Sequence, residues 1–396
     1  MLQVKLVRLD EAFPTPPAPP GTSLGPHDSL GPALDLVDDP VTRTDVEKVR
    51  FLADARRCLV GRVLVRSVLA KRAGVSHRSI AFEKTPTGRP YARPKVFAPS
   101  PPAATAAAGA CRPDFAFDDY NVSHDSDLVA VATVPTTTTT TNGAVPRVGI
   151  DVMRIANPWP GATVAEFVAG ISDQVLSERE RTRIEQELDD DDDENEKNAS
   201  PPRGRGRAAG TTTTKLEHAL ALWTLKEAYV KATGTGLASH SSSSSDSGDD
   251  DPLLRPDLVE FDLDLDLDLA REGHVVVGTA KSVDRQGGGR RPMMAGWEFH
   301  LVKVVLDRQH DRGRDEAGEG GGGATVSGDE YWIAVAQHDG SSPPPAAERE
   351  KGEGGGASGQ GRRRRREGHV TLVATTTPPA WLEFVPFDAV LATLRH

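Results

Sequence analysis

Apolar residues recur with helical spacing in two long segments of the chain. Between residues 46 and 73 they fall close to a 3.6-residue period, and Gly74 follows as a typical helix stop. A second helical segment runs over residues 215–233, and Gly234 comes directly after it. The sequence therefore predicts two long helices that lie far apart along the chain.

Short runs rich in β-branched residues, or alternating between apolar and polar positions, predict the strands. These runs are at residues 127–134, 147–152, 258–269, 271–280, 295–306 and 329–337. In the third run leucine alternates with aspartate, which puts every carboxylate on one face, as is usual in a solvated edge strand and rare in a metal site. Helices and strands follow one another too irregularly for a doubly wound parallel sheet. The pattern predicts an α+β fold of two modest subdomains.

Low-complexity tracts separate the patterned segments. Acidic, serine-rich, glycine-rich and arginine-rich tracts bury too little apolar surface to offset the entropy lost on ordering them. We therefore expect disordered insertions at loop tips, near residues 189–214, 239–251, 310–328 and 340–368. The expected subdomains are residues 1–142 and residues 143–396.

The overall charge restricts the class of protein. With 47 basic and 58 acidic residues the net charge is −11 over 396 residues, which argues against broad binding to nucleic acid or to an anionic membrane. Only two cysteines, Cys58 and Cys111, are present, so a disulfide framework is not expected. The chain has neither a signal-peptide pattern at its start nor an apolar run of about 18 residues. We expect a soluble cytoplasmic protein.

Three short motifs carry most of the chemical information. They are N-V-S-H at 121–124, V-G-I-D-V-M at 148–153, and W-T-L-K-E-A-Y-V-K-A-T-G-T-G-L at 223–237. Each motif is weak alone, but together and in this order they closely resemble the 4′-phosphopantetheinyl transferase family. The third motif is the most specific of them. The resemblance covers most of the patterned chain from about residue 46 to residue 338, and the layout is most similar to broad-specificity eukaryotic members that serve the aminoadipate reductase of lysine biosynthesis.

The resemblance implies a fold, a reaction and partners. The implied fold has two pseudo-related subdomains with coenzyme A in the cleft between them, the second subdomain carrying the metal site. The implied reaction transfers the 4′-phosphopantetheine arm of coenzyme A to a serine of an apo carrier protein and releases adenosine 3′,5′-bisphosphate. The carrier would be an acyl or peptidyl carrier protein or aminoadipate reductase. A monomer is expected because two related halves lie in one chain.

Two carboxylates are candidates for binding Mg²⁺. Asp151 ends a predicted strand and Glu227 lies on a predicted helix, and Mg²⁺ commonly takes one or two carboxylates together with phosphate oxygens and water. Many bacterial members of the family have a third carboxylate two residues after the aspartate. Here that residue is Met153, whose thioether has little affinity for Mg²⁺. We therefore expect a site with two carboxylates and an extra water.

Glu227 and Lys231 are four residues apart on a predicted helix and share one face. One interpretation is a surface ion pair worth a few tenths of a kcal/mol. The other, favoured by the apolar stripe beside them, puts the pair at the edge of a cleft. The resemblance then implies catalytic roles: Glu227 accepts the proton of the carrier serine and Lys231 contacts phosphate oxygens.

Five further residues are candidates for binding coenzyme A. The resemblance implies that Ser123 and His124 bind the 3′-phosphate, with a protonated His124 as a phosphate donor, although a lone histidine is more often structural. Arg89 stands where the family usually has lysine and can bind phosphate in a bidentate way. Arg50 and Arg56, on the first long helix, are weaker candidates, and a solvated helix face is their alternative.

A rival function uses the basic tracts. In it, a non-catalytic protein binds nucleic acid through R-G-R-G-R at 203–207 and through the arginines at 362–366. Such tracts lack interleaved aromatic residues and bind phosphates without specificity, and the rest of the chain is acidic. The motifs therefore favour the transferase, with no specific nucleic-acid partner.

Overall fold

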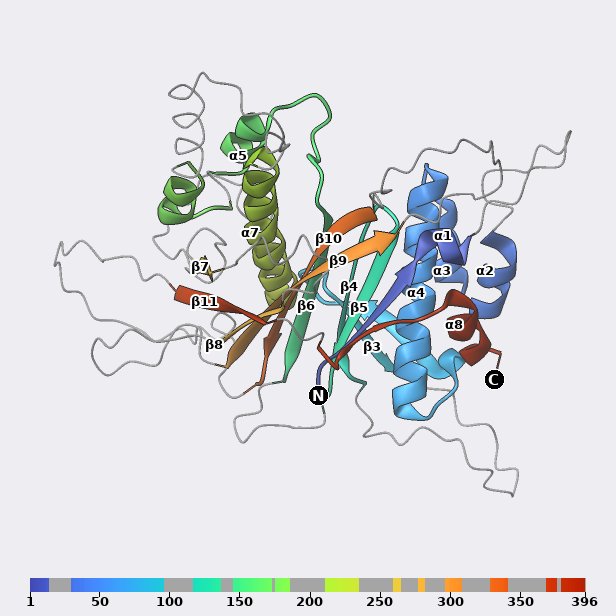
Figure 1. Cartoon of the computed structure of the whole chain (residues 1–396). Helices are drawn as coiled ribbons and strands as arrows, with labels where there is room; N and C mark the ends of the chain where they lie inside the picture. Colours follow the sequence, from blue (N-terminus) through green and yellow to red (C-terminus); the bar gives the residue numbers. More distant parts are fainter. Residues whose placement is uncertain are drawn as a thin grey trace, which may run out of the picture.

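The fold is seen in a computed structural model of the whole chain (Figure 1). The residues it describes are 1–13, 30–95, 117–136, 145–172, 175–185, 211–234, 259–264, 277–281, 296–307, 328–340, 368–375 and 379–395. Two larger β-sheets lie next to each other with helices on the two outer sides, so the predicted α+β class is consistent with the structure. None of the helices in these ranges is long and apolar enough to cross a membrane.

The first sheet has four strands in the order β12-β1-β5-β4. These are β1 (Gln3–Arg8), β4 (Asp119–Asp125), β5 (Leu128–Val134) and β12 (Leu382–Phe384). All seven residues of β5 are buried, as a central strand with both faces covered requires. β5 pairs antiparallel with β1 and with β4, and β12 runs parallel to β1.

Five helices accompany this sheet. They are α1 (Leu9–Ala12), α2 (Gly31–Val37), α3 (Pro40–Glu47), α4 (Leu52–Ala73) and α8 (Phe387–Thr393). The longest, α4, packs its apolar face on β4 and β5 and ends at Gly74 in the left-handed conformation, as predicted. The predicted helix over 46–73 is in fact two: Val46 is a core residue of the separate helix α3, and Phe51 is extended before α4 begins.

A small hairpin lies beside this layer. It follows the 3₁₀ turn η2 (His77–Ser79) and consists of the antiparallel strands β2 (Ile80–Lys84) and β3 (Pro90–Pro94). A tight turn joins the strands, in which Gly88 has a φ of +87° and its N–H donates to the carbonyl of Thr85 over 2.8 Å.

The second sheet has six strands in the order β6-β10-β9-β8-β11-β7. They are β6 (Arg147–Arg154), β7 (Val259–Asp264), β8 (Val277–Lys281), β9 (Trp297–Asp307), β10 (Gly328–His338) and β11 (Gly368–Thr375). The helices α5 (Val164–Ser172) and α7 (Thr211–Thr233) share a hydrophobic core with this sheet. The sequence did not predict β11, and α7 begins four residues before the predicted start at residue 215, inside one predicted insertion. Most of the other predicted insertions lie outside the described residues.

The two sheets meet where β4 lies against β6, a contact we call the seam. Four polar side chains of β4 each accept a hydrogen bond from a backbone N–H of β6, over 2.6–3.2 Å. The pairs are Asp119 with Val148, Asn121 with Ile150, Ser123 with Val152, and Asp125 with Arg154. Each pair is 29 residues apart, so the strands run parallel. The other edge of β6 pairs with β10, and the seam therefore satisfies N–H groups that a sheet edge would leave open.

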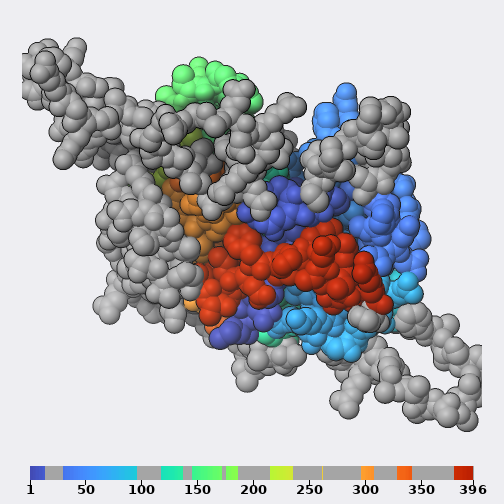
Figure 2. Space-filling view, turned by 45° about the vertical axis from the view of Figure 1, so that its right-hand side comes forward, coloured from blue at the N-terminus to red at the C-terminus, as the bar shows by residue number. Residues whose placement is uncertain are grey.

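The C-terminal segment, residues 379–395, packs with the first sheet. β12 pairs with β1, and α8 buries Phe387 and Val390 in the core under α4. Figure 2 shows this segment, in red, lying across the N-terminal elements in blue. The expected subdomain of residues 143–396 is therefore incorrect for these last residues, because strand pairing and apolar burial hold them on the other sheet. The boundary near residue 142 stays a prediction.

We predict that Phe387→Ala lowers the free energy of unfolding by about 3 kcal/mol, since it removes a buried ring that contacts Phe13 with centroids 5.6 Å apart. The matched control is Phe384→Ala in the adjoining strand, where the ring is 44% exposed and the loss should be much smaller. Chemical denaturation measures both. Equal losses would show that α8 contributes no specific packing.

Candidate active site

The end of α7 lies directly on β6 because residue 149 is glycine. A Cβ at Gly149 would lie 2.0 Å from the carbonyl oxygen of Ala228 and 2.5 Å from the backbone nitrogen of Ala232. No other residue allows so close an approach of helix and strand. This packing brings Glu227 and Lys231 of α7 onto the seam.

Asp151 is the centre of a compact polar cluster at the seam. Its Oδ1 lies 2.6 Å from Nζ of Lys231 and accepts a hydrogen bond from Oγ of Ser123 over 2.9 Å. Lys231 also donates to Oγ of Ser123 over 3.0 Å, and the N–H of Val152 donates to the same oxygen over 3.2 Å. The Ser123 hydroxyl thus donates once and accepts twice, which is its full capacity.

Glu227 completes the cluster and has an unusual protonation equilibrium. The side chain of Glu227 is half-buried. This desolvation, and then the charge of Asp151, raise the pKa of Glu227 to about 7, while the charge of Lys231 lowers it. A carboxyl group with such a pKa exchanges protons readily near neutral pH. The structure thus brings together three of the residues predicted for the site: Asp151, Glu227 and Lys231.

The donor set of this cluster fits a hard divalent cation. Asp151 and Glu227 supply carboxylate oxygens, and a cation between them would relieve the repulsion that helps to raise the pKa of Glu227. The described residues contain no group of three or more His, Cys, Asp or Glu side chains that could hold a metal. Met153 packs against the core under α7. A cation would therefore take two protein carboxylates and complete its shell with water or ligand oxygens.

Neighbouring Lys226 serves a different purpose. Its side chain is fully buried and pairs with Glu180, and its Nζ donates to the carbonyl of Val175 over 2.6 Å. Successive helical residues point in directions about 100° apart, so Lys226 faces the core while Glu227 faces the seam. This agrees with its being the weaker candidate.

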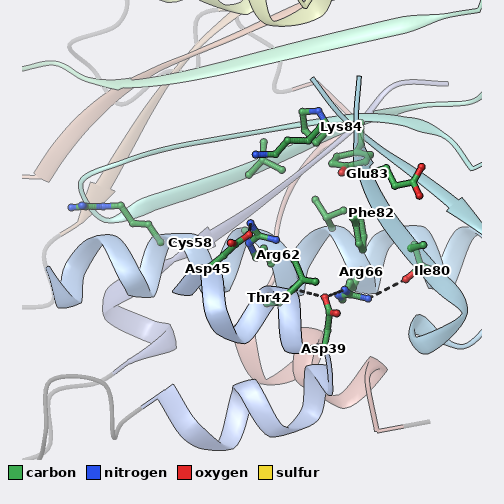
Figure 3. A pocket seen from close by; sticks show the side chains of 18 of the residues that line it. Asp39, Thr42, Asp45, Cys58, Arg62, Arg66, Ile80, Phe82, Glu83 and Lys84 are labelled. Carbon is green, nitrogen blue, oxygen red and sulfur yellow. Dashed lines mark hydrogen bonds and ion pairs between the residues drawn. The ribbon is translucent and has the colours of Figure 1, made fainter. Parts of the chain in front are cut away.

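A pocket of about 720 Å³ lies on the other face of β4 (Figure 3). Its walls come from α3, α4, the β2–β3 hairpin and β4. Strand residues alternate between two faces, so Tyr120, Val122 and His124 line the pocket while Asp119 and Ser123 bond to β6. Ser123 and His124 thus lie on opposite faces of the strand, and their joint role at the 3′-phosphate stays a prediction.

The pocket is rich in cations, and most of them are already paired. Figure 3 shows Arg66 between Asp39 and the carbonyl of Ile80, and its guanidinium lies 4.6 Å from the centroid of the Phe82 ring. Arg62 pairs with Asp45, and Arg57 with Asp54.

Two lysines of the pocket differ from these arginines. Among the described residues no ion pair involves Lys84 or Lys95, although the charge of Lys95 helps to lower the pKa of Asp39. Neither lysine is among the site residues predicted from the sequence. Lys84 could have been found from its position directly before the T-P-T-G-R-P segment.

His124 lines the pocket and also experiences the charge of Lys231 at the seam. Desolvation by the surrounding protein, and then the charges of Arg57 and Lys231, lower the pKa of His124, although the residue keeps substantial solvent access. This shift favours the neutral imidazole, and the protonated phosphate donor implied by the resemblance stays a prediction. A neutral imidazole can still donate one N–H to a phosphate.

The structure does not bring the three predicted arginines to the pocket. The buried guanidinium of Arg89 pairs with Asp119 through distances of 2.7 and 2.6 Å. Arg50 is exposed and stacks on Phe51, and Arg56 stacks on Phe13, with distances to the ring centroids of 5.3 and 5.1 Å. The next helix residue, Arg57, lines the pocket instead, because one step along a helix turns the side chain by about 100°.

Two family models match successive segments of the chain, one in the part that contains β4 and β5 of the first sheet and one in the part that contains α7. Residues 32–136 match the family model "4′-phosphopantetheinyl transferase, N-terminal", and residues 147–276 match "4′-phosphopantetheinyl transferase superfamily". The chain is 29% identical over 275 residues to a 4′-phosphopantetheinyl transferase of Paxillus involutus, which covers 66% of this chain and 82% of the relative. A phosphopantetheinyl transferase of Thraustochytrium is 26% identical over 54% of this chain and 58% of its own length.

An animal protein is also similar. The L-aminoadipate-semialdehyde dehydrogenase-phosphopantetheinyl transferase of Xenopus laevis is 22% identical over half of each chain. This chain therefore spans about half the length of some relatives and four fifths of another.

The charges at the seam predict opposite pKa shifts in two variants. Asp151→Asn removes a negative neighbour and should lower the pKa of Glu227 from about 7, whereas Lys231→Met removes a positive neighbour and should raise it. Carboxyl-selective NMR titration measures both values, with Glu227→Gln identifying the signal. Shifts in the same direction in both variants would contradict the described arrangement.

The raised pKa also predicts how stability depends on pH. Between about pH 4.5 and 7 the folded state holds a proton on Glu227 that the unfolded state has lost, so stability should fall as pH rises through this window. Glu227→Gln should remove that part of the pH dependence and leave the variant relatively more stable above pH 7. Denaturation of both proteins over this pH range tests the sign.

Proposed function

We infer that this chain, which belongs to the 4′-phosphopantetheinyl transferase superfamily, transfers the 4′-phosphopantetheine group of coenzyme A to a serine of an apo carrier protein. The single observation that carries the inference is the meeting of Asp151, Glu227 and Lys231 at the seam, with a pocket lined by Lys84 and Lys95 on the other face of β4. The other product is adenosine 3′,5′-bisphosphate.

The pocket is the proposed place for the nucleotide end of coenzyme A. Phe82 and Tyr120 offer aromatic surface to a base, and Lys84 and Lys95 offer charges to phosphates. His124 senses the charges of both Arg57, on the pocket side, and Lys231, at the seam. A pyrophosphate bound next to His124 would thus lie between the positive charge of Arg57 and that of Lys231.

The residues at the seam supply the chemistry. Glu227 accepts the proton of the carrier serine, directly or through water, while the serine oxygen forms a bond to the phosphorus next to the pantetheine arm. The bond from that phosphorus to the bridging oxygen breaks, and the nucleotide leaves with the electron pair. Lys231 stabilises negative charge on the phosphate oxygens and is held ready by its contact with Asp151. Mg²⁺, when bound to Asp151 and Glu227, would supply further charge neutralisation.

Several finer points belong to the same proposal. The carriers are acyl or peptidyl carrier proteins or an aminoadipate reductase of lysine biosynthesis. The names of the animal relatives support the last, since they contain the words L-aminoadipate-semialdehyde dehydrogenase. The halves are pseudo-related, since each has a sheet covered by one long helix, α4 or α7. The protein acts as a monomer, because one chain supplies both the pocket and the cluster at the seam.

The rival function rests on arginine tracts that lie outside the described residues. The arrangement at the seam favours the transferase, since binding nucleic acid needs no paired carboxylates. One experiment separates the two: the protein is incubated with coenzyme A, Mg²⁺ and an apo carrier protein, and the carrier is weighed by mass spectrometry. A mass gain of one phosphopantetheine group is expected, and no gain with any carrier class would overturn the proposal.

We predict that Glu227→Gln lowers the transfer rate by roughly 10²- to 10⁴-fold, because it removes the proposed base and a metal ligand. The fold should be retained, since the residue is only half-buried. The matched control is Glu47→Gln on the exposed face of α3, where the pair with Arg43 spans 3.6 Å and turnover should stay near that of the wild type. Wild-type turnover in Glu227→Gln would remove this residue from the mechanism.

The pocket gives a separate prediction about binding. Lys84→Met should weaken coenzyme A binding by roughly tenfold or more, because a hydrogen bond to a charged group is worth about 1.5–3 kcal/mol. Lys71→Met, on the exposed end of α4, is the control and should leave the affinity unchanged. Isothermal calorimetry measures both dissociation constants. An unchanged affinity in Lys84→Met would place the phosphates elsewhere.

A further inference from the structure

Arg89 links parts of the chain that lie far apart in the sequence. It follows the hairpin turn after β2, and that turn is held firmly: the N–H of Arg89 donates to Oγ1 of Thr85 over 3.0 Å, and the N–H of Thr85 donates to the carbonyl of Arg89 over 2.8 Å. The arginine side chain therefore starts from a fixed backbone. The whole residue is only 8% exposed.

The guanidinium binds both strands of the seam. Its two terminal nitrogens donate to the two carboxylate oxygens of Asp119 in β4 over 2.7 and 2.6 Å. One of these nitrogens also donates to the carbonyl of Val148 in β6 over 3.0 Å, and the N–H of Val148 donates back to Asp119 over 2.8 Å. Arg89 and Asp119 together close the seam at this end.

The third contact reaches the end of α7. Nε of Arg89 donates to the carbonyl of Lys231 over 3.3 Å, and that carbonyl is in the last turn of the helix, where carbonyls lack helical partners. Gly234 leaves room for the approach: its φ is +77°, and a Cβ there would lie 2.9 Å from Cδ of Arg89. Lys231 is thus held twice, by its carbonyl at Arg89 and by its ammonium group at Asp151.

These contacts leave little of Arg89 for a ligand. Four of its five N–H donors are used within the protein, and the residue does not line the pocket. We propose that Arg89 is a positioning residue for the transfer reaction. It fixes the last turn of α7 against the seam, and this sets the distances from Lys231 and Glu227 to Asp151. This inference rests on the proposed transferase function, but only the measurement of the transfer rate depends on that function.

The test compares Arg89→Lys with Arg93→Lys, an exposed arginine of the same hairpin that pairs with Glu83. Lysine keeps the charge but cannot make the fork of contacts to Asp119, Val148 and Lys231. Calorimetry gives the affinity and the number of binding sites for coenzyme A and for dephospho-coenzyme A. The transfer rate is then expressed per binding site, so that a loss of folded protein does not count as a loss of rate.

For Arg89→Lys we expect a rate per site at least tenfold lower, since displacements of about 1 Å can cost 10²-fold. Both affinities should stay within about threefold of the wild type, and Arg93→Lys should match the wild type throughout. An affinity loss for coenzyme A alone would make Arg89 a ligand of the 3′-phosphate and overturn the inference. An unchanged rate would overturn it as well.

A second readout does not depend on catalysis. Hydrogen exchange at the amides of residues 228–234 should become faster in Arg89→Lys, while the earlier turns of α7 keep the wild-type rates. Unchanged exchange in the last turn would contradict the positioning role even if the rate fell. If the wild type transferred nothing to any carrier, the proposed function would fail, while the exchange result would still judge the contact between Arg89 and α7.

Discussion

The rest of the structure depends on the hydrogen bonds from the backbone of β6 to the side chains of β4. An edge strand presents N–H groups that must find acceptors, and here Asp119, Asn121, Ser123 and Asp125 supply them in place of a backbone ladder. Short polar side chains at alternate positions can do this because strand residues alternate in direction. The bonds set the register of the two sheets, and they place Ser123 beside Asp151.

The same alternation divides the proposed functions between the two faces of β4. One face holds the second sheet, and the other face, with Tyr120 and His124, lines the pocket. Substrate binding is thus assigned to the N-terminal layer, whereas the carboxylates come from β6 and α7 of the second layer. The chemistry is expected at their junction, where a phosphate group bound by one layer meets the charged groups of the other.

Two lysine–carboxylate ion pairs near this junction differ in their surroundings. Lys226 and Glu180 are both buried and neutralise each other inside the second layer. Lys231 and the buried Asp151 pair at the seam, where the half-buried Glu227 has a pKa raised to about 7. The bond from Arg89 to the carbonyl of Lys231 ties the helix that carries these groups to both strands of the seam. A small shift of α7 would therefore change the distances from Glu227 and Lys231 to Asp151.

The sequence by itself determined many of the local elements and the identity of the central residues. Helical spacing predicted most of α4 and α7 with their glycine stops, and motif resemblance selected Asp151, Glu227 and Lys231, which do meet in space. Only the tertiary structure decided that Ser123 and His124 point to opposite sides, that Arg89 turns inward, and that Lys84 and Lys95 face the pocket. It also decided that residues 379–395 return to the first sheet. Helix and strand periodicity come from interactions between near neighbours, whereas the partner of a polar side chain depends on which distant strand packs against it.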